Sequence, residues 1–202
     1  MPRGVRISVA ARVNRAAFIT VATLAAIWEM FAAIELTRGT AIADFVSILF
    51  VTIGVFTVTA IHEVGHALGA LLVRARLRTI YVAPFALDLV TRKIQLVGLV
   101  GGRDVGGYVQ TQDGLHEIRR IDWIIIVAAG PAGSVVGGLL ILVVLNFAGI
   151  NDPFGITAFA AAIGFGSILA GLVNLWPASV GGFMTDGALI ADALRGWRPR
   201  RR

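Results

Sequence analysis

Two histidines and a glutamate fall within five consecutive residues of an apolar segment, His62-Glu63-Val64-Gly65-His66. If this segment is helical, a spacing of four residues places both imidazoles on one face of the helix, one turn apart. That spacing suits two ligands of one metal ion. Zinc is the expected ion, because it accepts neutral imidazole and its catalytic sites keep a position open for water. Glu63 lies beside the first ligand and would act as the general base toward that water.

The composition places this motif in a membrane protein. The chain has 202 residues, of which 57% are hydrophobic and 15% are charged, whereas a soluble domain averages about 45–50% apolar and about 25% charged residues. These values also exclude intrinsic disorder, collagen and coiled coil. Ionisable side chains within an apolar helix are costly in lipid and are functional by default. A purely structural pair of histidines with a buried glutamate is therefore the weaker interpretation.

The apolar runs predict a membrane all-α bundle of about four to five transmembrane helices, at about 20 residues for each crossing. The first run exceeds the 7–15 residues typical of a signal-peptide core and is expected to be a retained span. A short helix is expected after the last span. The predicted spans cover residues 16–36, 41–73, 123–147 and 154–176, and the short helix covers residues 186–195.

Residues 79–110 have a different character, because short β-prone runs alternate there with Pro84 and with several glycines. Such segments are typical of strands and turns. An open sheet exposed to lipid would leave backbone groups without partners, so a membrane-associated β-hairpin or sheet packed against protein or at the surface is expected. Residues 178–185 are predicted to form a glycine-containing loop.

The net charge of +6 arises almost entirely from arginines between the apolar runs. Basic residues that flank spans mark the cytoplasmic side, so the charge indicates membrane topology rather than nucleic-acid binding. Both termini are predicted to be cytoplasmic, in an integral membrane protein. The absence of cysteine excludes disulfides and thiolate metal ligands. The basic clusters lie at residues 3–15, 74–93, 119–120 and 195–202.

A catalytic zinc site needs a third protein ligand. Asp186 is the strongest candidate, because it follows a span that reaches the cytoplasmic side near the level of His66. Asp192 is the alternative, and His116 is a weaker one because its surroundings are polar. Glu29, inside the first predicted span, could line a cavity, but a local polar partner is at least as good an explanation.

These motifs together resemble the site-2 protease family of intramembrane zinc metalloproteases. The resemblance rests on the histidine motif, on Gly130-Pro131, on Asn174-x-x-Pro177 and on Asp186-Gly187. It implies one zinc ion held by His62, His66 and Asp186, with Glu63 as the catalytic base. It further implies that Asn174 helps to hold the substrate backbone or the developing oxyanion. The implied activity is hydrolysis of peptide bonds in or near the transmembrane segments of membrane proteins.

The segment Gly106-Gly107-Tyr108-Val109 also resembles the glycine–aromatic segment of that family's membrane-associated β-hairpin. Gly107, Tyr108 and Val109 are therefore expected to bind substrate, with the β-prone segment offering an edge to an unwound peptide. The chain is expected to be a single membrane-embedded domain over residues 1–202, without appended regulatory domains, in lipid of a bacterial cell membrane. The alternative is a metal transporter or a proteolytically inactive regulator. A role for Glu63 in hydrolysis would distinguish a protease from both.

Overall fold

The three-dimensional structure is a computed structural model of the chain. It describes residues 27, 43–97, 106–112, 118–148, 156–180 and 183–196. The predicted first span at 16–36, including Glu29, lies outside the described residues apart from Ile27. His116 also lies outside them.

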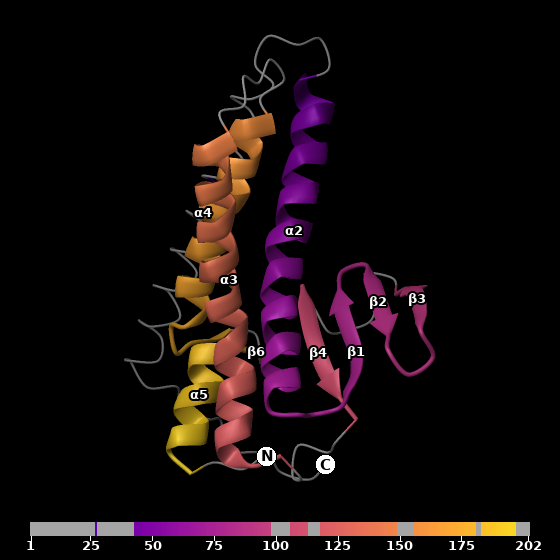
Figure 1. Cartoon of the computed structure of the whole chain (residues 1–202), viewed down its shortest axis with the longest axis vertical. Helices are drawn as coiled ribbons and strands as arrows, with labels where there is room; N and C mark the ends of the chain where they lie inside the picture. The colour runs from indigo at the N-terminus through magenta and orange to yellow at the C-terminus, as the bar shows by residue number, and fades with distance from the viewer. Residues whose placement is uncertain are drawn as a thin grey trace, which may run out of the picture.

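Three long helices lie side by side and form the body of the molecule (Figure 1). They are α2 (Ala43–Leu72), α3 (Arg120–Ala148) and α4 (Ile156–Asn174). Within the described part of the chain, three helical stretches are long and apolar enough to cross a membrane: Leu49–Leu72, Arg120–Ala148 and Ile156–Asn174. The predicted helices at 41–73, 123–147 and 154–176 therefore match within a few residues, whereas the predicted total of four to five is not confirmed.

Glycines allow the three helices to approach closely. A β-carbon added to Gly65 of α2 would collide with the carbonyl oxygen of Ala129 in α3, and one added to Gly138 of α3 would collide with the carbonyl oxygen of Gly164 in α4. Small residues at helix contacts are how membrane helices gain close packing in the absence of a hydrophobic driving force. Glycines thus allow α3 to pack closely against the part of α2 that carries the histidine motif.

A four-stranded antiparallel sheet occupies the region predicted to contain strands, which confirms that prediction. Its strands are β1 (Leu77–Val82), β2 (Phe85–Asp88), β3 (Lys93–Leu96) and β4 (Gly107–Thr111), in the spatial order β3-β2-β1-β4. In Figure 1, β4 is the strand nearest to α2, and β3 lies farthest out. Phe85 packs edge-to-face on Phe56 of α2, with ring centroids 6.0 Å apart. Because β4 is the last strand in this order, one of its edges faces away from the sheet, beside α2.

The prediction of a loop at 178–185 is wrong. Ser179–Val180 (β5) and Phe183–Met184 (β6) pair as a two-stranded hairpin, which is closed by a hydrogen bond from the Thr185 nitrogen to the Ala178 oxygen, 3.0 Å long. Strands of two residues are too short to produce the alternating pattern that identifies a strand in sequence. The hairpin leads into α5 (Asp186–Leu194), the predicted short helix, which lies beside the lower end of α3 (Figure 1).

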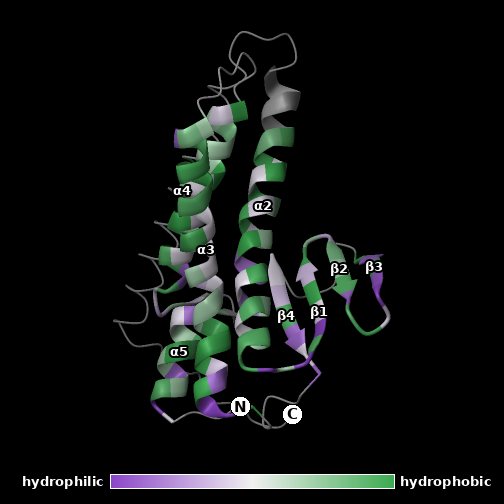
Figure 2. Cartoon of the chain, viewed as in Figure 1, coloured by the Kyte–Doolittle hydropathy of each residue, from purple (hydrophilic) through white to green (hydrophobic). Residues whose placement is uncertain are grey.

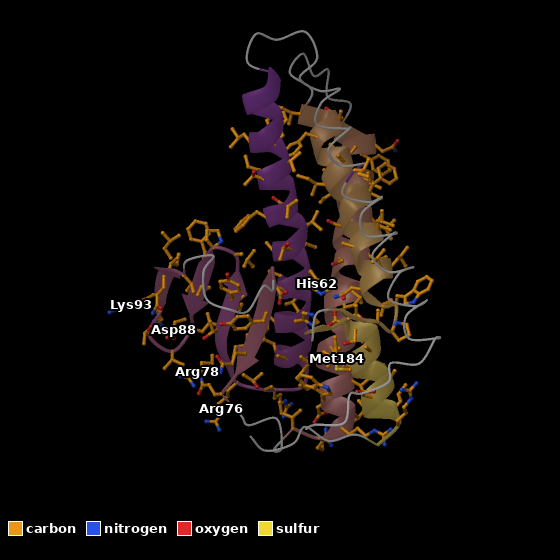
Figure 3. The ribbon with its side chains drawn as sticks, turned by 180° about the vertical axis from the view of Figure 1, so that it is seen from behind. His62, Arg76, Arg78, Asp88, Lys93 and Met184 are labelled. Carbon is orange, nitrogen blue, oxygen red and sulfur yellow. The ribbon has the colours of Figure 1, made fainter. Side chains whose placement is uncertain are left out.

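Polar residues concentrate at one end of this arrangement. Figure 2 shows predominantly apolar residues along the three long helices and hydrophilic residues at the lower ends of α3, α5 and the sheet. Arg76, Arg78 and Lys93 are labelled along the sheet in Figure 3. Arg119 and Arg120 lie at the start of α3. This distribution agrees with an integral membrane protein that has one strongly basic end.

Candidate metal centre

The two histidines converge as their spacing predicts. His62 and His66 lie on one face of α2, and their Nε2 atoms are 3.1 Å apart. Each side chain is only 13% exposed. Gly130 of α3 makes room for one of them, because a β-carbon at this position would collide with the His66 imidazole. The glycine in Gly130-Pro131 is therefore required by the size of the ring beside it.

Both imidazoles are oriented by hydrogen bonds from their other ring nitrogen to α3. His66 Nδ1 donates to the carbonyl oxygen of Ile126 over 2.8 Å, and His62 Nδ1 lies 2.9 Å from the hydroxyl oxygen of Ser134. Because a carbonyl oxygen only accepts, the neutral His66 ring carries its proton on Nδ1 and leaves the Nε2 lone pair available. Partners of this kind fix the tautomer and orientation of metal-binding histidines.

Ser134 was missed in the sequence. Its side chain is completely buried between the helices, three residues after Pro131. The surrounding residues form a series of small side chains, which in sequence indicates only close helix packing. Nothing in that pattern distinguishes a serine that faces a histidine 72 positions away from one that packs against a neighbouring helix.

Asp186 completes a group of three potential ligands. Its Oδ2 atom lies 3.0 Å from Nε2 of His62 and 3.3 Å from Nε2 of His66. The ligand atoms of these three residues all lie within 4.8 Å of one another. Burial raises the pKa of the Asp186 carboxyl, but hydrogen bonds with His62 and His66 outweigh it, so the pKa lies below its ordinary value. The carboxyl is thus held in the ionised form that can bind a cation.

The position of Asp186 depends on Thr185, the N-cap of α5. The Thr185 hydroxyl accepts hydrogen bonds from the backbone nitrogens of Ala188 and Ala178, and donates to the carbonyl oxygen of Trp176 over 2.5 Å. An N-cap side chain satisfies donors that the first helical turn would otherwise leave unpaired. Here the same hydroxyl also fastens the base of the β5–β6 hairpin, and so fixes where α5 begins.

Asn174 lies at the end of α4 and contacts this group. Its Nδ2 atom donates to Oδ2 of Asp186 over 2.6 Å and is 3.0 Å from Nε2 of His62. Its Oδ1 atom accepts from the backbone nitrogen of Asp186 over 3.4 Å. Asp192, the alternative third ligand, instead forms an ion pair of 3.7 Å with Arg195 and does not belong to the group.

Glu63 lies beside the three potential ligands and is 5% exposed. Its Oε2 atom is buried and has no hydrogen-bond partner among the described residues. Gly107 of β4 packs directly on the carboxyl group, since a β-carbon there would come within 2.5 Å of Oε1. A buried carboxyl oxygen without a partner is costly unless a further group, such as water or an ion, completes its surroundings.

Gly107, Tyr108 and Val109 lie on β4. The Tyr108 ring stacks on Tyr81 of β1 with centroids 5.0 Å apart and is 40% exposed. β4 thus packs on the carboxyl group of Glu63 at Gly107 and continues from there as an edge strand of the four-stranded sheet.

The Peptidase M50B-like family model matches residues 41–176, which include α2, the sheet, α3 and α4. The chain belongs to this family. No curated protein and no solved structure matches the chain significantly. Because the M50B-like family is the site-2 protease family, the resemblance seen in the sequence is confirmed. Membership makes the chain a membrane protease of the metallopeptidase class.

The M50B-like match ends ten residues before Asp186. Only the three-dimensional arrangement brings this carboxylate to the two histidines. The donor set fits the zinc of the M50B-like family, because two imidazole nitrogens and one carboxylate oxygen are a common three-ligand combination of catalytic zinc. The partnerless Oε2 of Glu63 beside this set agrees with the same assignment.

Proposed function

We propose that this chain is an intramembrane zinc metalloprotease, which hydrolyses peptide bonds in or near the transmembrane segments of membrane proteins. One observation carries the proposal. Two imidazole nitrogens from the apolar helix α2 and an ionised carboxylate oxygen from α5, all within 4.8 Å of one another, lie beside the buried carboxyl of Glu63 in α2. Ionisable groups are rare in such surroundings unless they serve a function.

In this proposal His62, His66 and Asp186 hold one zinc ion. When bound, zinc supplies Lewis acidity toward the scissile carbonyl and lowers the pKa of water. Ser134 and the Ile126 carbonyl keep the two Nε2 lone pairs directed at the site. Glu63 removes the proton from the attacking water and then delivers it to the leaving amine, which is the usual sequence for a general base in peptide hydrolysis.

The backbone geometry of β4 supports substrate binding by strand addition. Directly opposed residues in an antiparallel ladder alternate between hydrogen-bonded and non-hydrogen-bonded pairs. Ala83 and Gly106 form a hydrogen-bonded pair, with a 2.9 Å bond from the Ala83 nitrogen, so the opposed pairs Val82–Gly107 and Ile80–Val109 are of the other type. The backbone groups of Gly107 and Val109 then point away from β1, toward the outer edge.

That outer edge has no strand partner among the described residues and begins where Gly107 packs on Glu63. An extended peptide paired with β4 would thus run past the proposed catalytic base. A transmembrane helix must unwind before hydrolysis because its carbonyl groups are otherwise engaged. Strand addition at an exposed sheet edge supplies partners for the unwound backbone.

The proposal also covers the setting of the reaction. The three apolar helices and the basic end of the described part support an integral membrane protein with that end in the cytoplasm. From the sequence we further propose a single catalytic domain in a bacterial cell membrane, with both termini in the cytoplasm. The proposed substrates are membrane proteins whose spans lie beside the enzyme in lipid.

The test uses the full-length chain purified in detergent and reconstituted into liposomes with a panel of tagged single-span membrane proteins. We expect about one zinc per chain and cleavage of at least one panel member, both abolished by a strong zinc chelator and restored by added zinc. Zinc uptake into the vesicles without cleavage of any panel member would instead support a metal transporter. A zinc-loaded chain that neither cleaves nor transports would support an inactive regulator.

A further inference from the structure

Asn174 and Asp186 are joined by two reciprocal hydrogen bonds across the β5–β6 hairpin. The amide nitrogen of Asn174 donates to Oδ2 of Asp186 over 2.6 Å, and the backbone nitrogen of Asp186 donates to the Asn174 amide oxygen over 3.4 Å. The second bond fixes the orientation of the amide, because a backbone N–H requires the oxygen on its side. The two contacts together connect the last residue of α4 to the first residue of α5.

The amide acts on the oxygen that belongs to the metal centre. Oδ2 is the atom of Asp186 that lies 3.0 Å from His62 and 3.3 Å from His66. Asn174 Nδ2 is also 3.0 Å from Nε2 of His62. Both polar atoms of the amide are therefore engaged with Asp186 or His62, and neither is directed at a group outside the proposed ligand set.

The hairpin explains why such a connection is needed. Twelve positions separate Asn174 from Asp186, and the chain between them leaves α4, forms β5 and β6, and returns. Thr185 fastens the base of the hairpin through hydrogen bonds of its hydroxyl to Trp176 and Ala178. These bonds fix where α5 begins, but they do not involve the carboxyl group of Asp186. The Asn174 amide is the group that aims the carboxylate itself.

We propose that Asn174 is a positioning residue, which holds the Asp186 carboxylate against the two histidines, rather than a group that binds the substrate backbone or the oxyanion. The inference rests on the proposed function, since it assigns Asp186 to a zinc site. Partners that orient metal ligands commonly contribute about 10- to 100-fold to metal affinity. A group that contacts only the substrate contributes nothing to the zinc affinity measured without substrate.

The experiment measures zinc affinity of the full-length protein in detergent, without substrate, by competition with a chelating dye. The variants are Asn174→Ala and the nearly isosteric Asn174→Asp, which replaces the donor beside Oδ2 with an oxygen. The matched control is Ser167→Ala, because Ser167 is a completely buried residue of the same helix whose hydroxyl has no hydrogen-bond partner among the described residues. The cobalt-substituted proteins are compared by visible absorption, which reports the ligand geometry.

We expect Asn174→Ala to weaken zinc binding by about 10- to 100-fold and to change the cobalt spectrum, while Ser167→Ala leaves both at the wild-type values. If Asn174→Ala fails to fold, the same comparison is made with Asn174→Asp, for which a changed cobalt spectrum is expected. Wild-type zinc affinity and an unchanged spectrum, combined with lost cleavage, would overturn the inference in favour of a substrate contact. Failure of the proposed function is distinguishable, because the wild-type protein itself would then either bind no zinc or bind zinc without cleaving any membrane protein of the panel.

Discussion

The backbone of Gly107 lies directly on the carboxyl group of Glu63, and a β-carbon on Gly107 would come within 2.5 Å of Oε1 and 2.6 Å of Cγ. The sheet and the histidine-bearing helix therefore meet at the proposed catalytic base. Any side chain at position 107 would displace either β4 or the carboxyl group.

We therefore expect Gly107→Ala to reduce cleavage by at least about 10-fold, which corresponds to about 1.4 kcal/mol in the activation free energy, while the zinc content stays unchanged. Gly106→Ala is the matched control, because a β-carbon there meets only the side chain of Thr59, at ordinary contact distances of 3.8–3.9 Å. Initial rates on one tagged membrane substrate measure both variants. Equal rates for the two variants would show that β4 does not need to lie this close to Glu63.

Zinc analysis of purified variants tests the ligand set. His62→Ala, His66→Ala and Asp186→Ala should each lose most of the bound zinc, since each removes one of the three proposed protein ligands. Asp192→Ala should retain it, because Asp192 pairs with Arg195 and lies outside the ligand group. Full zinc occupancy in Asp186→Ala, or zinc loss in Asp192→Ala, would contradict the assignment.

Glu63→Gln should separate zinc binding from hydrolysis. Glutamine has nearly the same shape but cannot accept a proton at neutral pH, and loss of a general base typically costs about 10²- to 10⁴-fold in rate. We expect zinc content at the wild-type level and a loss of cleavage within that range. Cleavage at the wild-type rate would exclude Glu63 as the base.

Ser134→Ala tests the orientation of His62. Removing the hydroxyl leaves the Nδ1 atom of His62 without its partner at 2.9 Å, so we expect zinc affinity to fall by about 10- to 100-fold. The helix contact should persist, because alanine fits wherever serine does. Thermal unfolding of the zinc-free protein provides the control: a midpoint near that of zinc-free wild type, with weakened zinc binding, is the expected combination, whereas unchanged affinity would contradict the role.

Val109→Pro tests strand addition at the outer edge of β4. Proline removes the backbone N–H of residue 109, which points away from β1, so the pairing of β4 with β1 should survive while the outer edge loses a donor. We expect cleavage to be lost and zinc to be retained. Val109→Ala, which keeps the N–H, should cleave at close to the wild-type rate, and normal cleavage by Val109→Pro would argue against substrate pairing at this edge.

Local features of the structure were predictable from the sequence. The relation between His62 and His66 is a property of one helical turn, so their spacing predicts that they share a face wherever the helix lies. Apolar runs likewise predicted α2, α3 and α4 within a few residues, because a membrane requires long continuous apolar helices. The change to β-prone residues after α2 predicted the location of the four-stranded sheet.

Contacts between distant elements could not be predicted in the same way. Ser134 is 72 positions from His62, and its burial in a series of small residues carries no sign of a hydrogen bond to an imidazole. The hairpin before α5 was missed because strands of two residues have no periodicity. Asn174 and Asp186 lie on either side of this hairpin, 12 positions apart, and their side chains are in contact.

By itself, the sequence determined that the chain is an apolar membrane protein with a histidine pair and a glutamate in one helix, and the motifs identified the family. Only the tertiary structure decided that Asp186 rather than Asp192 joins His62, across 124 positions of the chain. It also decided that Gly107 lies on Glu63 and that Gly130 lies on His66. The physical reason is that helical spacing is a local property, whereas the contacts of Asp186 and its supporting partners with the two histidines depend on how α3, α4, α5 and the sheet pack against α2.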